Sequence, residues 1–130
     1  MKFLAKLQDL AYTLLRVFGG FMFACHGAQK LFGVFGWPMA APHPGELLWF
    51  AGLIELVLGL AIALGIQTRF AAFICSGEMA VAYYIGHWHG DFGQNFFPLV
   101  NHGELAVLYC FVFLFIATEG PGLWALDRKN

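Results

Sequence analysis

Four apolar stretches, separated by shorter polar or glycine-containing segments, make up most of the chain. They cover about residues 10–32, 46–66, 69–88 and 102–119. A membrane-spanning helix needs about 20 predominantly apolar residues, within a range of roughly 17 to 25. The pattern therefore predicts an all-α integral membrane protein, a bundle of four transmembrane helices that forms a single domain over residues 1–130.

The first stretch is expected to be a retained helix rather than a cleaved signal peptide. Lys2 and Lys6 precede it, as basic residues do in a signal peptide, but the apolar run begins only near Leu10 and continues past Cys25. Phe23 is also too large for the small-residue pattern of a cleavage site.

Lysine and arginine residues outside the apolar stretches predict the orientation. Lys2 and Lys6 lie near the N-terminus, Arg69 in the second loop, and Arg128 and Lys129 near the C-terminus. Cytoplasmic loops of membrane proteins carry the excess of positive charge, so we expect both termini to be cytoplasmic. The first and third loops then face outward, and this outer half holds all five histidines: His26, His43, His87, His89 and His102.

Composition strengthens the membrane interpretation and excludes other classes. Only 12% of the residues are charged and 60% are hydrophobic, whereas about 25% charged residues are usual in a soluble domain. The net charge of −1 offers no basic surface for nucleic acid. The three cysteines lie inside apolar stretches without a C-x-x-C motif, so we expect buried thiols rather than disulfides.

The charged residues inside the apolar stretches are the most informative. Arg16, His26 and Lys30 share one face of the first predicted helix. At about 1.5 Å of rise per residue, Glu55 lies nearly level with His26, and Glu78 comes within reach of Arg16. Unpaired charges at this depth are costly. We therefore predict a buried charge network of Arg16 and Glu78, and a polar cluster that opens outward: His26, Lys30 and Glu55.

The polar cluster of His26, Lys30 and Glu55 is a candidate catalytic site. Burial disfavours the imidazolium form of His26, whereas the nearby carboxylate of Glu55 favours it. These opposing effects leave the imidazole proton exchangeable near neutral pH. The alternative, in which His26, Lys30 and Glu55 only fix the register of the helices, stays open from sequence alone.

Two further sets of polar residues lie near the start of the fourth stretch. Asn101 and Glu104 have the spacing of a capping box, so we expect them to cap the fourth helix. His87, His89 and His102 are candidate ligands for copper, zinc or iron, provided that the chain leaves the helix between the first two. The alternative is that these histidines bind no metal.

Several short segments resemble one family of membrane proteins. "HGAQKLFG", "GLIELVLGLAIALGIQTRFAA", "NHGELAVLYCFVFLFIA" and "GPGLWALD" occur in this order between about residues 16 and 127. Together they resemble the DoxX family of small four-helix membrane proteins. The chain departs from the family at His102, where relatives often carry asparagine. The resemblance rests on these positions: His26, Gly27, Lys30, Glu55, Gly59, Thr68, Arg69, Asn101, Gly103 and Glu104.

The resemblance implies a multi-pass protein of the bacterial inner membrane that works with other redox subunits. Some relatives are subunits of thiosulfate:quinone oxidoreductase, and another type belongs to an oxidative-stress complex. A quinone-linked oxidoreductase subunit is therefore the first hypothesis, with quinone as the expected cofactor. A non-catalytic assembly subunit of a larger membrane complex is the alternative. A carrier of protons or small solutes is the third, and it lacks the inverted repeats that such carriers often show.

Overall fold

The computed structural model describes residues 2–36 and 41–127. Arg128 and Lys129, on which part of the predicted orientation depends, lie outside these residues. The described part contains helices and no strand, which confirms the all-α fold class. The elements are α1 (Lys2–Ala5), α2 (Gln8–Phe32), α3 (Leu47–Leu64), α4 (Thr68–Tyr83), the π-helical turn η1 (Tyr84–Trp88), the 3-10 turn η2 (Gln94–Phe96), α5 (Pro98–Asn101) and α6 (Glu104–Glu119).

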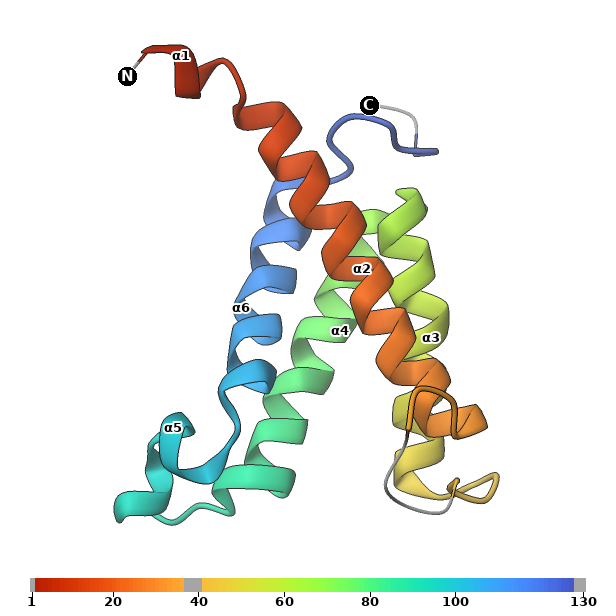
Figure 1. Ribbon diagram of the computed structural model, residues 1–130, viewed down its shortest axis with the longest axis vertical. Helices are drawn as coiled ribbons and strands as arrows, with labels where there is room; N and C mark the ends of the chain where they lie inside the picture. The colour runs from red at the N-terminus through yellow and green to blue at the C-terminus, as the bar shows by residue number, and fades with distance from the viewer. Residues whose placement is uncertain (1, 37–40, 128–130) are drawn as a thin grey trace.

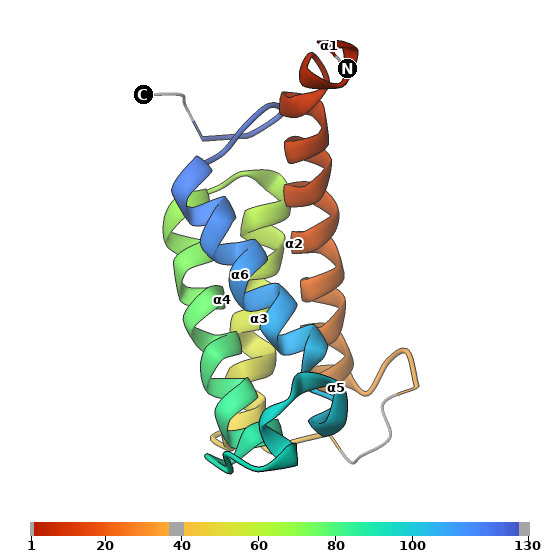
Figure 2. The ribbon, with the colours of Figure 1, turned by 90° about the vertical axis from the view of Figure 1, so that its left-hand side faces the viewer.

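The four long helices run alternately up and down the molecule. Both chain ends lie at one end of the bundle, together with the turn between α3 and α4 (Figure 1). The connection between α2 and α3 and the short elements before α6 lie at the opposite end (Figures 1 and 2). An even number of antiparallel passes therefore brings the two ends of the chain to the same end of the molecule.

Helices α2 and α3 pack with their backbones in close contact. A Cβ atom built on Gly20 would lie 2.6 Å from the backbone nitrogen of Ala63, and one on Gly27 would lie 2.3 Å from that of Leu56. A Cβ atom on Gly59 would likewise lie 2.7 Å from the nitrogen of Ala24. Glycines permit such an approach, on which helix association in lipid depends.

Helix α4 packs along α6, and a compact core lies between this pair and α2 with α3. The hydroxyl of Ser76 donates to the carbonyl oxygen of Cys110 at 2.8 Å. Phe23 of α2 lies against Phe113 of α6 with a distance of 4.7 Å between ring centroids. Ile62 of α3 is completely buried beside them, so side chains from all four long helices form the core.

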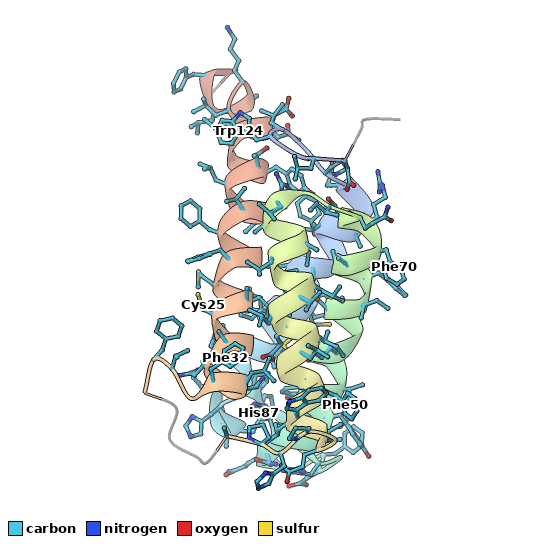
Figure 3. The ribbon with its side chains drawn as sticks, turned by 90° about the vertical axis from the view of Figure 1, so that its right-hand side faces the viewer. Cys25, Phe32, Phe50, Phe70, His87 and Trp124 are labelled. Carbon is cyan, nitrogen blue, oxygen red and sulfur yellow. The ribbon has the colours of Figure 1, made fainter. Side chains whose placement is uncertain are left out.

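The outer surface of the bundle is rich in large apolar side chains. Phe32, Phe50 and Phe70 point away from the helices (Figure 3), and between 50% and 66% of their surface is exposed. Apolar exposure on this scale marks a surface that contacts lipid or another protein.

The ends of the helices differ by a few residues from the expected bounds. Helix α3 ends at Leu64 because Gly65 takes a left-handed conformation with φ of 70°, which terminates helices. Helix α4 continues directly into η1, so a helical run extends from Thr68 to Trp88. Among the described helices, α3 alone is long and apolar enough to cross a membrane by length and composition.

The C-terminal segment folds back over the end of the bundle that carries both termini. The backbone N–H groups of Leu126 and Asp127 donate to the carbonyl oxygens of Leu64 and Gly65 at 3.1 and 2.7 Å. The carboxylate of Asp127 accepts hydrogen bonds from the backbone of Gln67 and Thr68, each at 2.8 Å. This segment therefore ties the end of α3 to the start of α4.

Candidate functional site

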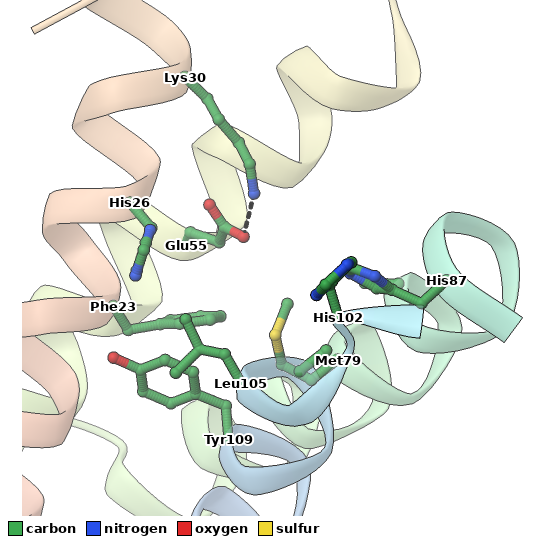
Figure 4. Close-up of a pocket in the computed structure, with 11 residues that line it drawn as sticks. Phe23, His26, Lys30, Glu55, Met79, His87, His102, Leu105 and Tyr109 are labelled. Atoms are coloured by element: carbon green, nitrogen blue, oxygen red, sulfur yellow. Dashed lines mark hydrogen bonds and ion pairs between the residues drawn. The ribbon is translucent and has the colours of Figure 1, made fainter. Parts of the chain in front are cut away.

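A cavity of about 240 Å³ lies where the two helix pairs face each other, at the end of the bundle opposite the chain termini. Helices α2 and α3 supply its charged side chains, and α4 and α6 supply most of its apolar ones (Figure 4). The lining residues are Phe23, His26, Lys30, Glu55, Met79, Ala82, His87, His102, Leu105, Ala106 and Tyr109.

The centre of the polar wall is an ion pair between Lys30 and Glu55. Lys30 lies in the last turn of α2, where a cation is also favoured by the helix dipole. Glu55 lies in the middle of α3 and is only 2% exposed, while the lysine side chain is 18% exposed. A buried pair repays its desolvation only when both charges stay together, so the pair fixes α2 against α3 at the cavity.

His26 lies one turn before Lys30 and also lines the cavity. Its ring approaches that of Tyr109 edge-on, with 6.2 Å between the ring centroids and an interplanar angle of 86°. The carboxylate of Glu55 takes its hydrogen bond from Lys30. The structure thus brings the three predicted residues to one cavity, where Lys30 pairs with Glu55 and the ring of His26 lies against that of Tyr109.

Two polar atoms of residues that line the cavity have no hydrogen-bond partner among the described residues. They are Oε2 of Glu55 and the hydroxyl of Tyr109, and both are buried. Tyr109 is only 6% exposed. Buried polar atoms are nearly always bonded in folded proteins, and these two atoms are hydrogen-bonding groups that the described residues leave unsatisfied.

The sequence did not single out Tyr109 as a site residue. The signal that locates it is a stripe of buried residues along α6, at intervals of three and four: Ala106, Tyr109, Phe113 and Ile116. This stripe faces the core, and its only hydroxyl lies at the cavity. A tyrosine on the buried face of an apolar helix is more often a packing residue, which is why the pattern alone is not decisive.

The predicted three-histidine set is not assembled. His87 and His102 line the cavity, whereas His89 is exposed and does not. Nδ1 of His87 is 3.0 Å from the carbonyl oxygen of Asn101. In residues 2–36 and 41–127, no three His, Cys, Asp or Glu side chains are grouped closely enough to hold a metal ion. The chain turns between the first two histidines, at His89 with φ of 57°, and this turn separates them.

The predicted pairing of Arg16 with Glu78 is wrong. The guanidinium of Arg16 instead donates to carbonyl oxygens of α3 and the C-terminal segment, at 2.7 to 2.8 Å: Ile62, Ala63 and Leu123. The last carbonyls of a helix have no partner within it, and they compete successfully for the guanidinium. Arg16 is therefore a structural residue that caps α3.

The predicted capping box at the start of α6 is also wrong. The helix begins at Glu104 with Gly103 as its N-cap, and no side chain bonds there. The side-chain oxygen of Asn101 accepts from the backbone of Gly103 at 2.8 Å, and its amide donates to the hydroxyl of Tyr83 at 3.0 Å. The short helix α5 and the left-handed His102 place Asn101 too early to cap α6.

Comparisons with known proteins agree with this architecture. The model of the DoxX family matches residues 11–88. An uncharacterized protein of Haemophilus influenzae is 41% identical over 133 residues, covering 99% of this chain and 97% of that protein. The inner membrane protein YqjF of Escherichia coli is 29% identical over 126 residues, covering 95% and 94%. No solved structure shows significant similarity.

The fold and the cavity define a small all-α protein with an apolar outer surface and an ion pair, Lys30–Glu55, at the cavity. The family match covers more than half of the chain, and the chain belongs to the DoxX family. It is a membrane protein of this family.

Proposed function

We propose that this protein is a four-span protein of the bacterial inner membrane that binds a quinone in the cavity, as the membrane subunit of an oxidoreductase. The observation that carries the proposal is that two residues lining the cavity each have a buried atom without a described partner, Oε2 of Glu55 and the hydroxyl of Tyr109. The relative YqjF, named an inner membrane protein, supports the location.

The lining residues match the chemistry of a quinone and its reduced form. The carbonyl oxygens of a quinone accept hydrogen bonds, and the hydroxyl of Tyr109 and a ring N–H of His26 are suitable donors. The hydroxyl groups of a quinol donate, and the free carboxylate oxygen of Glu55 is a suitable acceptor. Phe23 and Met79 supply apolar contacts for the ring.

Conversion of a quinone to a quinol takes up two electrons and two protons. A partner redox subunit supplies the electrons. The groups of this chain hold and orient the bound molecule and exchange protons with its two oxygens, for which the imidazole of His26 is the best suited. Lys30 holds the carboxylate of Glu55 in place through their ion pair.

The four-span arrangement is supported by the antiparallel order of the four long helices, which differ in length (Figure 1). Helix α2 has 25 residues and α3 has 18. Helix α4 gains a further turn from η1, and α6 has 16 residues, which span about 24 Å at 1.5 Å per residue. That length is somewhat shorter than the roughly 30 Å core of a bilayer, and local thinning or flanking residues accommodate such a difference.

Replacement of Tyr109 by phenylalanine tests the quinone site. The hydroxyl has no hydrogen-bond partner within residues 2–36 and 41–127, so its removal leaves the fold at least as stable as before. We expect Tyr109→Phe to bind a short-chain ubiquinone about tenfold more weakly than the wild type, equal to roughly 1.4 kcal/mol. The measurement is a quinone titration of purified protein in lipid nanodiscs, with Tyr84→Phe, outside the cavity, as control.

The same titration separates this function from a purely structural one. The Lys30–Glu55 pair, which fixes α2 against α3, is the observation that favours a non-catalytic assembly subunit as the second candidate. Equal quinone affinity in the wild type and Tyr109→Phe, or no quinone binding by either, would contradict the proposed site and favour the assembly role.

A further inference from the structure

A second cavity, of about 340 Å³, adjoins the one that contains the ion pair. Its walls come from α4 with η1, from α6, and from the segment around residues 96–98. Phe111, one of its lining residues, is 64% exposed, so the cavity opens on the outer surface of the bundle. The quinone ring placed in the first cavity does not account for this space.

The second cavity is lined for an apolar ligand. None of the described residues that line it is charged. The hydroxyl of Tyr83 donates to the carbonyl oxygen of Phe96 at 2.8 Å, and Nε1 of Trp88 donates to that of Asp91 at 2.7 Å. Because these polar atoms are already bonded, Tyr83 and Trp88 offer the cavity the carbon atoms of their rings. The lining therefore suits a hydrocarbon chain.

An aromatic wall closes the end of this cavity at the π-helical turn η1. Tyr84 and Trp88, both on η1, meet edge-on with 5.7 Å between their ring centroids. The ring of Trp88 also lies 5.5 Å from that of Phe96. Single π-helical turns within helices are frequent at functional sites. Here the turn brings two large rings of one helix to the same cavity.

The two cavities meet at Met79, whose side chain lines both. They lie on different sides of α6, because Ala106 and Tyr109 line the first cavity and Val107 and Cys110 line the second. Met79 is only 6% exposed. Its unbranched side chain has three rotatable bonds and adapts readily to its neighbours. A flexible chain that runs from one cavity to the other therefore passes this side chain.

We propose that the second cavity holds the isoprenoid tail of the quinone whose ring occupies the first. This inference rests on the proposed quinone site. A membrane quinone carries its tail on the ring, so the tail leaves the first cavity through one of the walls. The wall of Lys30 and Glu55 is charged and unsuited to a hydrocarbon. Met79 is apolar and borders a cavity that opens on the outer surface, from which the tail continues into lipid.

Binding of two quinones to the purified protein in lipid nanodiscs tests the tail site. One is a ubiquinone without a tail, and the other carries two isoprene units. Val107→Phe narrows the second cavity. Val57→Phe, at an exposed position of α3 that lines neither cavity, is the matched control. Each quinone is compared between proteins, so its own partitioning into lipid cancels.

We expect Val107→Phe to bind the tailed quinone about tenfold more weakly than the wild type, since an isoprene unit buries about as much apolar surface as a leucine side chain. Its affinity for the tailless quinone should stay within about twofold, and Val57→Phe should match the wild type for both. Tyr109→Phe, which acts on the ring, should weaken both quinones equally.

The outcomes separate the two proposals. If Val107→Phe binds the tailed quinone as the wild type does, the second cavity holds lipid acyl chains or no chain, and the tail site is overturned while the ring site stands. Equal weakening of both quinones by Val107→Phe would overturn it too. Binding of neither quinone by the wild type would overturn the proposed function and the tail site together.

Cross-linking to the wild type keeps the test valid if Val107→Phe does not accumulate. A ubiquinone with a photoreactive diazirine on its tail is bound, illuminated and located by mass spectrometry. We expect labelling of Val107, Cys110 or Phe111, and excess tailless quinone should reduce it because the rings compete for the first cavity. Labelling confined to other residues, or labelling that the tailless quinone leaves unchanged, would overturn the proposal.

Discussion

At the scale of single residues, glycines bring the backbones of α2 and α3 into contact. Gly27 of α2 meets the backbone of Gly52 and Leu56 on α3, where an added Cβ would come within 2.6 and 2.3 Å. Gly19, eight residues earlier on the same helix, has no atom within 4 Å of its Cβ position. Alanine substitutions at Gly27 and Gly19 therefore compare the effect of an added methyl group at a helix contact with its effect at an open position.

Replacement of Gly27 by alanine should push α2 and α3 slightly apart and destabilise the protein. The added methyl group meets backbone rather than a movable side chain, so the helices must shift, and overpacking of this kind costs about 1–3 kcal/mol. We expect Gly27→Ala to lower the free energy of unfolding in detergent by that amount. Gly19→Ala should be neutral or more stable by up to about 1 kcal/mol, because alanine favours the helix. Equal stability of the two variants would contradict the close helix contact.

The residue scale also explains what sequence patterns reveal about the site. The grouping of His26, Lys30 and Glu55 at one cavity could be predicted from the sequence. Their spacing along a helix and their relative depth both follow from the rise per residue. The same depth argument failed for Arg16 and Glu78. It ignores the carbonyl oxygens at the end of a helix, which bind a guanidinium as well as a carboxylate does in the right geometry.

At the scale of elements, the helices depend on the segments that close their ends. Asp127 accepts hydrogen bonds from the backbone of Gln67 and from the backbone and hydroxyl of Thr68, all at 2.8 Å. It therefore caps α4 from a distant part of the chain. The sequence placed helix ends within a few residues, but the apolar pattern holds no signal for a cap supplied by a residue about 60 positions away.

Removal of this cap should give a pH-dependent loss of stability. The backbone N–H of Thr68, with further hydrogen bonds from its hydroxyl and from Gln67, holds the pKa of Asp127 below its ordinary value. Because the pKa is lowered by folding, the stabilisation is complete above the unfolded value of about 3.9. It is lost as the pH falls through the lower pKa of the folded protein.

We expect Asp127→Asn to reduce the free energy of unfolding at pH 7 by about 1 kcal/mol, as other helix caps do. Below about pH 4 the difference from the wild type should shrink, because the wild-type carboxyl then takes up a proton. Thermal unfolding in detergent between pH 3 and pH 7 measures both effects, with Asp9→Asn, an exposed residue in the first turn of α2, as control. A difference that is constant with pH would contradict the cap.

At the scale of the whole molecule, two helix pairs flank a cavity with a charged wall, and the outer surface of the bundle is apolar. The glycine contacts join α2 to α3, and the bond from Ser76 to Cys110 joins α4 to α6. The cavity lies between the pairs, where Tyr109 faces His26. Sequence patterns predicted the helices themselves, whereas the pairing of helices and the part played by α6 depend on packing that no local pattern encodes.

The whole-molecule arrangement leads to a topological prediction. Both ends of the chain lie at one end of the bundle (Figure 1). The cavity is lined by residues near the other end, among them Lys30, His87 and His102. Lys6 and Arg69 belong to the first end, and positive residues favour the cytoplasm. We therefore expect four spans with cytoplasmic termini, and a cavity that opens toward the outer side.

Reporter fusions in the native membrane test this topology. A periplasmically active reporter such as alkaline phosphatase should be active when fused after residue 43 or 95 and inactive after residue 68 or 130. A cytoplasmically active reporter at the same positions should give the opposite pattern, which controls for expression. Activity after residues 68 and 130 instead would place the cavity on the cytoplasmic side. Because short loops orient by their lysines and arginines, Arg69→Glu should weaken the orientation, whereas Glu104→Gln should leave it unchanged.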